Sequence, residues 1–160
     1  MDKTLHTVDK TLCSTILDLI PQKPPFRFVE DIIEVDKAHA VATCVFSGEE
    51  EFYKGHFPGH PVTPGVILIE TMAQAGLVVT AINMDLSQGK NPDEIRKKTT
   101  LFTLVDEVEF FRVVPPNTRV ISRSETVFAR RGHLRCRVGL EFENGERICG
   151  GLLSGKGVDL

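Results

Sequence analysis

The sequence predicts an α+β domain in which an antiparallel β-sheet wraps around one long central helix. Residues 65–84 are apolar on every helical face, which is typical of a helix surrounded by protein. Most segments after residue 100 are rich in β-branched and aromatic residues or alternate apolar with polar ones, as half-buried strands do. A sheet with one apolar face must cover that face, and this helix is the only large apolar partner that the sequence offers.

Composition predicts a single domain over residues 1–160 and excludes several classes of protein. Hydrophobic residues make up 41% and charged residues 26%, as in soluble globular proteins. With 19 Lys and Arg against 22 Asp and Glu, the net charge of −3 provides no positive field for nucleic acid. Glu70 and Gln74 interrupt the most apolar stretch, so we expect no membrane span. The N-terminus lacks an apolar signal-peptide core, and the four cysteines are scattered, which favours a reducing, cytoplasmic setting.

The first third of the chain is expected to contain a short helix and a hairpin. Residues 1–20 form an N-terminal extension whose end, residues 12–20, is an amphipathic helix stopped by the prolines that follow. Residues 26–35 and 38–46 are predicted as two strands joined by a tight turn at Asp36-Lys37. Residues 49–65 are rich in Gly and Pro, which predicts an extended or looped path without regular helix.

The rest of the chain is expected to hold the central helix and most of the sheet. The helix begins at Pro64-Gly65 and runs to about Met84, a length of about 30 Å. A polar, charged loop is predicted over residues 85–98. Four strands then follow, for a total of five or six in the chain, and Asn144-Gly145 is a strong hairpin signal between the last two. The four predicted strands are residues 101–114, 119–129, 134–142 and 147–153.

Glu70 is the anomaly of the apolar helix, because it places a carboxyl group among Ile, Val, Ala and Leu. A desolvated carboxyl prefers to be neutral, which raises its pKa and makes it a proton donor near neutral pH. Gln74 lies one turn further along and can orient the carboxyl by a hydrogen bond. The alternative is that Glu70 reaches the edge of the sheet or pairs with an arginine.

His56 is the candidate base that precedes this acid. Prolines 58 and 61 prevent the helix on which the spacing of His56 and His60 would suit a metal, so we expect no metal site. A rigid turn at Phe57-Pro58-Gly59 supports His56, although a structural or solvated histidine is the alternative. The free N–H groups at the helix start, at Gly65 and Val66, can bind an oxyanion. Base, oxyanion donors and acid thus fall within 15 residues.

The segment GHFPGHPVTPGVILIETMAQAG, residues 55–76, resembles the signature of the 3-hydroxyacyl-acyl-carrier-protein dehydratases of type II fatty-acid synthesis, the FabZ/FabA group. Residues 20–36 and 105–118 resemble two further parts of that family, and the likeness spans most of residues 16–153. The resemblance implies the hot-dog fold, which is a sheet wrapped around a central helix. It also implies dehydration of (3R)-3-hydroxyacyl-ACP to trans-2-enoyl-ACP, in fatty-acid or related acyl-chain biosynthesis, with no metal or organic cofactor.

The same resemblance assigns roles to individual residues. His56 matches the histidine that removes the C2 proton, and Glu70 matches the acid that protonates or binds the leaving hydroxyl. Gly65 matches the glycine whose N–H polarises the thioester carbonyl. Glutamate rather than aspartate at position 70 implies the branch that dehydrates without moving the double bond. Thr63 departs from the large apolar residue that many members carry there.

The resemblance also implies partners. Family members form homodimers, often three to a hexamer, in which each site takes its histidine from one chain and its acid from the other. The acyl carrier protein is acidic, so the basic cluster formed by Arg130, Arg131, Arg135 and Arg137 is a candidate docking surface, with a solvated strand face as the alternative. Arg96, Lys97 and Lys98 form a second basic group.

Two other functions stay open at this point. A hot-dog acyl thioesterase would use an acid to activate water and would not need His56 in this place. A non-catalytic acyl-carrier-binding subunit would not need to keep both His56 and Glu70. The intact His-Phe-Pro-Gly block and Glu70 favour the dehydratase over both.

Overall fold

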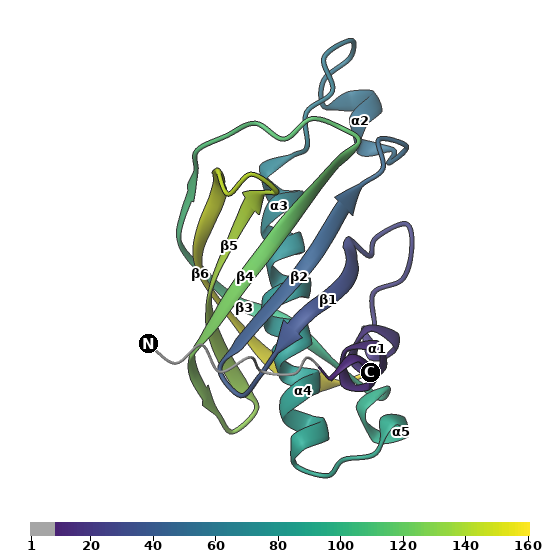
Figure 1. Ribbon diagram of the computed structural model, residues 1–160, viewed down its shortest axis with the longest axis vertical. Coiled ribbons are helices and arrows are strands. Elements are labelled where there is room, and N and C mark those ends of the chain that lie inside the picture. Colours follow the sequence, from purple (N-terminus) through teal and green to yellow (C-terminus); the bar gives the residue numbers. More distant parts are fainter. Residues whose placement is uncertain (1–8) are drawn as a thin grey trace.

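One six-stranded antiparallel sheet curls around a central helix, which confirms the predicted α+β class (Figure 1). The structure is a computed structural model that describes residues 9–160. Neighbouring strands pair in the order β1-β2-β4-β5-β6-β3, so that the two earliest strands lie at one edge and β3 at the other. The strands are β1 (Val29–Val35), β2 (His39–Phe46), β3 (Lys98–Phe110), β4 (Thr118–Arg130), β5 (His133–Phe142) and β6 (Arg147–Asp159).

The central helix is continuous but changes its winding in the middle. Helix α3 (Gly65–Met72) passes into a π-helical segment, η1 (Ala73–Val78), and then into α4 (Val79–Ser87). In η1 the N–H of Val79 donates to the carbonyl of Gln74, five residues back. Residues 71–80 are all buried, whereas Val66 in the first turn is 72% exposed. The helix is long and apolar enough to cross a membrane, but most of it lies inside the sheet, where a core helix belongs.

Gly76 sets how closely the helix approaches the sheet. A Cβ built on this glycine would lie 2.6 Å from Cγ2 of Val138 on β5 and 3.3 Å from Cβ of Ser124 on β4. Both distances are shorter than ordinary carbon–carbon contact, so any side chain here would push the helix away from the strands. The core on either side is filled by large residues, including Phe28, Phe46, Met72, Leu77 and Leu140.

Helix α1 (Lys10–Leu19) begins two residues before the start predicted for it. The reason is Asp9, whose carboxylate accepts a hydrogen bond of 3.0 Å from the N–H of Leu12 and so caps the helix. Cys13, Ile16 and Leu19 are its buried face. Residues 1–8 of the predicted N-terminal extension lie outside the described residues.

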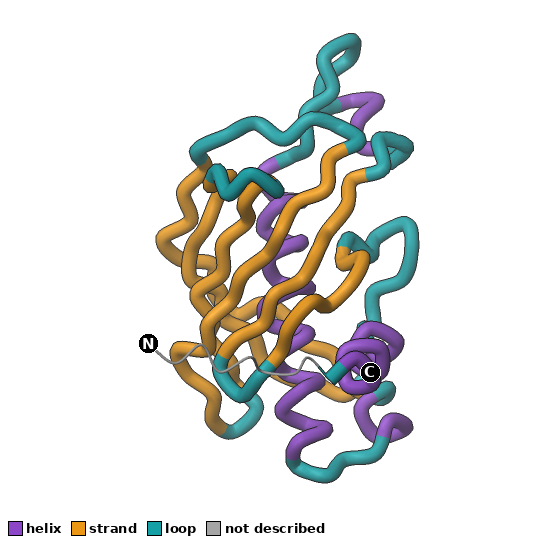
Figure 2. Tube along the Cα trace, in the orientation of Figure 1, coloured by secondary structure: helices purple, strands orange, loops and turns teal. Residues whose placement is uncertain are grey.

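Two segments predicted as loops contain helix, and both predictions were wrong (Figure 2). Helix α2 (Phe52–Gly55) forms inside residues 49–65 because its residues precede the prolines, which therefore block nothing. Helix α5 (Pro92–Ile95) forms inside residues 85–98 because Asn91 and Glu94 make a capping box and Pro92 suits the first turn. The central helix also extends to Ser87 rather than Met84.

Strand β3 is shifted from its predicted bounds: it begins at Lys98 rather than Leu101 and ends at Phe110 rather than Val114, so the strand predicted over residues 111–114 was wrong. Strand β6 continues to Asp159, beyond the predicted Leu153. They pair along their whole length, from Lys98 opposite Asp159 to Phe110 opposite Cys149. Strand β3 is the edge of the sheet and is mostly exposed, in spite of its apolar composition. Its exposed large side chains are Leu101, Phe102, Leu104, Val105 and Phe110. An exposed, apolar edge strand is a surface on which another chain can pair.

Candidate active site

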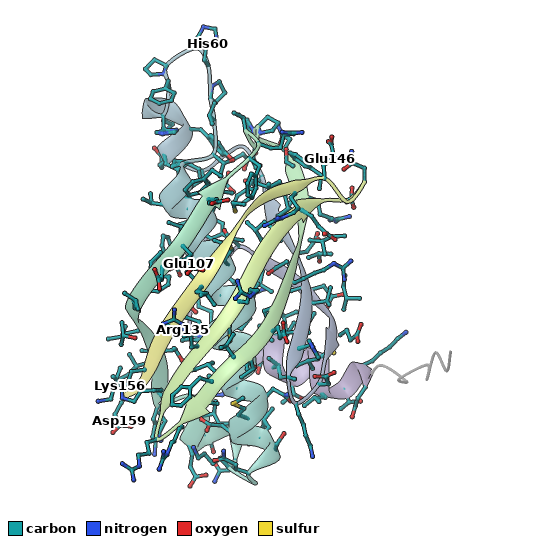
Figure 3. The ribbon with its side chains drawn as sticks, turned by 90° about the vertical axis from the view of Figure 1, so that its left-hand side faces the viewer. His60, Glu107, Arg135, Glu146, Lys156 and Asp159 are labelled. Atoms are coloured by element: carbon teal, nitrogen blue, oxygen red, sulfur yellow. The ribbon has the colours of Figure 1, made fainter. Side chains whose placement is uncertain are left out.

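Figure 3 shows His60 at the tip of a loop that projects beyond the sheet. A backbone hydrogen bond between His56 and Val62 closes this loop and places His56 at its base. The Nδ1 atom of His56 lies 2.8 Å from the carbonyl oxygen of Val62, and the N–H of Val62 donates to the carbonyl of His56. A carbonyl can only accept, so Nδ1 carries the proton of the neutral ring. The other nitrogen, Nε2, is therefore the unprotonated one and is ready to act as a base.

Two further contacts hold this loop. Its ends are joined by the hydroxyl groups of Tyr53 and Thr63, which form a buried hydrogen bond of 2.6 Å. At its tip, Phe57 and His60 exchange backbone hydrogen bonds, and Gly59 adopts a positive φ of 77° that suits glycine. Phe57, Pro58 and Gly59 thus form the turn at the tip of the loop. The hydroxyl of Thr63 joins the two ends of the loop through its hydrogen bond with Tyr53.

Glu70 and Gln74 form the contact predicted from their spacing. The amide nitrogen of Gln74 donates to Oε1 of Glu70 at 2.8 Å. The same amide also donates to the carbonyl of Phe26 at 2.8 Å and accepts from the N–H of Phe28 at 2.9 Å. Gln74 is fully buried, and these bonds fix its orientation. It is therefore a rigid donor that holds the carboxyl group of Glu70.

Burial raises the pKa of Glu70 above its ordinary value. Hydrogen bonds from Gln74 and from Gln22 lower this pKa but only in part offset the effect of burial. The carboxyl pairs with no arginine among residues 9–160, so the alternative of an ion pair is not realised there. A carboxyl in this environment is suited to donating a proton.

Gln22 is a site residue that the sequence analysis missed. It lies in the loop between α1 and β1, in the segment IPQKPPF, and its side chain reaches the carboxyl of Glu70. The one feature of the sequence that could have indicated Gln22 is that it is a polar residue in a segment that resembles the dehydratase family. Position in the sequence alone did not reveal it, because 48 residues separate Gln22 from Glu70.

Gly65 lies at the start of α3, as predicted. The hydrogen-bond ladder of the helix opens with the N–H of Ile67 donating to the carbonyl of Pro64, so the N–H groups of Gly65 and Val66 come before it. A Cβ on Gly65 would lie 3.1 Å from Cζ of Phe110 on β3. The aromatic ring therefore lies directly against the backbone of Gly65, which needs a residue without a side chain.

The structure brings Glu70, Gln74 and Gln22 together, whereas His56 has other partners. Within residues 9–160, the ring of His56 has Val62 as its hydrogen-bond partner and Phe57 stacked against it, with ring centroids 4.1 Å apart. The carboxyl of Glu70 faces the two glutamine amides instead. The candidate base therefore lies in the loop that follows α2, and the candidate acid lies on α3 of the central helix.

The four arginines of the predicted docking cluster do not share one surface. Arg135 forms an ion pair of 2.9 Å with Asp106 and lies on the outer face of the sheet (Figure 3). Arg137 lies two residues further along β5, on the same face of the strand. Arg130 and Arg131 lie at the turn between β4 and β5, on the wall of a separate pocket of about 470 Å³.

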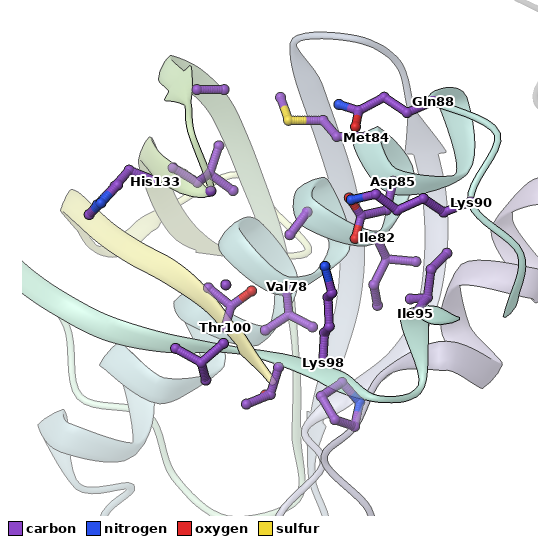
Figure 4. Close-up of a pocket in the computed structure, with 18 of the residues that line it drawn as sticks. Val78, Ile82, Met84, Asp85, Gln88, Lys90, Ile95, Lys98, Thr100 and His133 are labelled. Carbon is purple, nitrogen blue, oxygen red and sulfur yellow. The ribbon is translucent and has the colours of Figure 1, made fainter. Parts of the chain in front are cut away.

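This pocket lies beside α4, at the end of the central helix (Figure 4). The loop after α2 is at the opposite end of the molecule (Figure 1). Its apolar lining includes Val78, Ile82 and Ile95, and Lys98 and His133 also face it. Its basic residues are Lys90, Lys98, Arg130 and Arg131, of which Lys90 is paired with Asp85. The pocket thus combines an apolar floor with a largely cationic rim. Among residues 9–160, no three His, Cys, Asp or Glu side chains gather as a metal site requires.

Comparison with known proteins identifies relatives by sequence. The model of the FabA-like domain family matches residues 20–149. A 3-hydroxyacyl-[acyl-carrier-protein] dehydratase FabZ from Geotalea uraniireducens is 36% identical over 118 residues, which are 73% of this chain and 77% of the relative. The enzyme of the same name from Caldicellulosiruptor bescii is 32% identical over 93% of this chain and 96% of its own length.

Solved structures show the same fold at low sequence identity. A dehydratase heterocomplex, ApeI:P from Xenorhabdus doucetiae, matches with a TM-score of 0.71 and 14% identity, over 90% of this chain and 91% of the other. A thioesterase from Haemophilus influenzae matches with a TM-score of 0.55 and 14% identity, over 81% of this chain and 78% of the other. The hot-dog fold is therefore confirmed, and it is shared by enzymes of both chemistries.

Proposed function

The chain belongs to the FabA-like domain family, and we infer that it is an enzyme that dehydrates 3-hydroxyacyl thioesters carried by an acyl carrier protein. The product is the trans-2-enoyl thioester of fatty-acid or related acyl-chain biosynthesis. One observation within the site supports this reaction above the others. The chain contains both a histidine fixed in the tautomer of a base and a carboxyl group whose pKa is raised by burial.

Each residue then has one task in the reaction. Nε2 of His56 removes the proton from C2 of the (3R)-3-hydroxyacyl thioester. The N–H of Gly65 donates to the thioester carbonyl, where negative charge develops as the C2 proton leaves. Glu70 gives its proton to the hydroxyl at C3, which departs as water. Thioester hydrolysis would leave the base at His56 without a task, and this favours the dehydratase over the thioesterase.

A homodimer is part of the proposal, because within residues 9–160 of one chain His56 and Glu70 neither bond to each other nor share a hydrogen-bond partner. We propose that the His56 loop of one copy reaches the Glu70 of the other, and that dimers can assemble further into a trimer of dimers. The exposed apolar residues around the start of α3 support this arrangement, since Val66 and Val113 are 72% and 66% exposed. Phe57, Phe110 and Phe111 are exposed near them, and the edge strand β3 continues the same apolar surface.

The carrier protein is proposed to dock at the rim of the pocket beside Arg130, Arg131 and Lys98 (Figure 4). These cations suit an acidic partner, and the apolar floor suits an acyl or pantetheine chain. Arg135 contributes less to docking than the sequence suggested, because Asp106 already neutralises it. A cytoplasmic location is also proposed, and the four free, buried cysteines support a reducing compartment.

The test of the function is turnover of a short trans-2-enoyl-ACP, followed by loss of the enoyl absorbance as water adds. We expect wild type to hydrate it and His56→Ala or Glu70→Gln to be slower by about 10²–10⁴-fold. Both variants should keep the thermal unfolding midpoint close to that of wild type, which separates chemistry from folding. Release of free thiol by wild type without hydration would identify a thioesterase instead. A carrier protein that binds but never reacts would identify a non-catalytic subunit.

A further inference from the structure

The loop between α1 and β1, residues 20–28, forms one wall of the space around Glu70. Gln74 holds this loop through the carbonyl of Phe26, at 2.8 Å, and the N–H of Phe28, at 2.9 Å. Because the same Gln74 amide donates to Glu70, the loop has a fixed position relative to the carboxyl group. Gln22 enters the site from this wall.

The side chain of Gln22 is only half satisfied. Its amide lies beside the carboxyl of Glu70 and lowers the pKa of that group, while its oxygen, Oε1, is buried and has no partner within residues 9–160. The other buried side-chain atoms without a partner in this part of the chain are the hydroxyl oxygens of Ser122, Ser124 and Thr126. Those hydroxyls lie on β4, where Ser124 faces the helix at Gly76.

An amide oxygen differs from a hydroxyl in what it can do. It has two lone pairs and no hydrogen, so it can only accept. Leaving such an acceptor buried and unpaired is unfavourable, and native proteins rarely do so without a reason. A reason exists if a ligand supplies the missing donor. Because Gln22 lies beside Glu70, a donor that reaches Oε1 also comes close to the carboxyl group.

We propose that Oε1 of Gln22 accepts a hydrogen bond from the C3 hydroxyl of the substrate and then binds the water that this hydroxyl becomes. The proposal rests on the dehydratase function given above. In the reaction, Glu70 transfers its proton to the C3 oxygen and the C3–O bond breaks. The electron pair of the C2–H bond forms the C2=C3 double bond, and His56 keeps the C2 proton. Gln22 exchanges no proton.

The balance of donors and acceptors explains why two acceptors are needed. Water leaves with two O–H groups, and after the transfer Glu70 is a carboxylate that accepts one of them. Oε1 of Gln22 accepts the other. The amide of Gln22 meanwhile donates to the new carboxylate, as that of Gln74 does, and both bonds favour its charged form. Gln22 therefore acts on the hydroxyl and on the acid at once.

The experiment compares two ligands that differ only in the hydroxyl. His56→Ala serves as the background, so that the hydroxylated ligand is not consumed. Dissociation constants are measured by calorimetry for (3R)-3-hydroxydecanoyl-pantetheine and for decanoyl-pantetheine, with Gln22 intact and with Gln22→Met. Methionine keeps the length of the side chain and removes both polar groups. Lys23→Met is the matched control, because it changes the exposed neighbour in the same loop.

We expect Gln22→Met to weaken binding of the hydroxylated ligand about tenfold, the value of one good hydrogen bond, and to leave the saturated ligand unchanged. Lys23→Met should change neither. Equal weakening of both ligands would mean that Gln22 only shapes the loop, and no change for either would mean that it does not touch the hydroxyl. Either result overturns the proposal.

Two checks keep the result independent of other failures. Gln22→Asn retains the amide but withdraws it by one methylene, so it should show the same selective loss if Gln22→Met folds poorly. The chain with His56 intact is assayed in parallel for dehydration of the hydroxylated ligand. Dehydration there, together with equal weakening in the binding assay, would reject the role of Gln22 alone. Absence of dehydration would reject the function and this proposal with it.

Discussion

The two side chains proposed as catalytic, His56 and Glu70, depend on neighbours that take no part in the proposed reaction. The carbonyl of Val62 fixes the proton of His56 on Nδ1, and the amide of Gln74 fixes the carboxyl of Glu70. Neither partner would change the identity of the acid or base, but each determines the state in which it meets the substrate. Among the influences on the pKa of Glu70, burial is the largest, and it raises this pKa.

This raised pKa predicts how stability depends on pH. An acid whose pKa is higher in the folded than in the unfolded state costs stability once the pH rises above the unfolded value, here 4.5. The cost grows with pH until the folded pKa is passed and is constant above it. Glu70→Gln removes the charge, so the variant should gain stability relative to wild type as the pH rises from 4.5 to 8.

The measurement is urea unfolding of wild type and Glu70→Gln at several pH values. Glu49→Gln changes an exposed carboxyl and provides the control, for which we expect no comparable trend. A stability difference between Glu70→Gln and wild type that stays constant with pH would show that burial does not perturb this carboxyl.

At this scale the sequence predicted one of the supporting contacts and missed two others. The contact between Glu70 and Gln74 follows from a spacing of one helical turn and was confirmed. The role of Val62 depends on a backbone carbonyl, which no side-chain pattern reveals. Gln22 was missed because its contact with Glu70 arises only after the loop has folded against the helix.

Among the elements, the central helix is the one on which the site depends most. It carries the N–H of Gly65, the acid and the amide in consecutive turns, and the close approach at Gly76 fixes its distance from β4 and β5. Residues 71–80 are buried, so a shift of the helix would disturb the whole core.

Gly76→Ala is therefore expected to destabilise the fold by about 1–3 kcal/mol, the usual cost of overpacking a core. The reason is that the new methyl group would lie 2.6 Å from Cγ2 of Val138. Gly55→Ala in α2 is the control, since its Cβ would meet no atom within 4 Å. Chemical denaturation compares the two variants, and equal free energies of unfolding would contradict the close contact.

Element boundaries show where local sequence signals fail. The Gly- and Pro-rich character of residues 49–65 concealed α2, because composition averages over a window that includes residues before the first proline. The capping box that starts α5 was present in the sequence, at Asn91 and Glu94, and was hidden within a charged segment. The exposure of Val66 could not be predicted from its hydrophobicity. Hydrophobicity favours burial of a side chain, but it does not say whether the same chain or another one buries it.

For the whole molecule, the turn between β4 and β5 is where the substrate carrier is proposed to bind. Arg130→Gln with Arg131→Gln should raise KM for a carrier-bound substrate about threefold to tenfold, with little change for a pantetheine-linked one, because two cations near an acidic partner are lost. Arg119→Gln removes a charge at the opposite end of β4 and should have no such effect. Equal KM changes for both substrates would contradict docking at this rim.

The fold class, with its six strands and single buried helix, could be derived from sequence because alternation and burial are local patterns. How two copies would complete a site could not be derived from those patterns, since the residues proposed to meet belong to different chains. The resemblance to the dehydratase family alone supplied that expectation, and it stays a prediction.

The most direct test of the account mixes two inactive proteins. His56→Ala and Glu70→Gln chains are unfolded together, refolded at equal concentration and assayed for hydration of a trans-2-enoyl thioester. About half of the dimers formed at random contain one chain of each variant. If each site takes His56 from one chain and Glu70 from the other, one of the two sites in such a mixed dimer is intact. About a quarter of wild-type activity should therefore return. Each variant refolded alone should stay inactive. If the mixture stays as inactive as its parts while forming mixed dimers, the site does not combine His56 of one chain with Glu70 of the other.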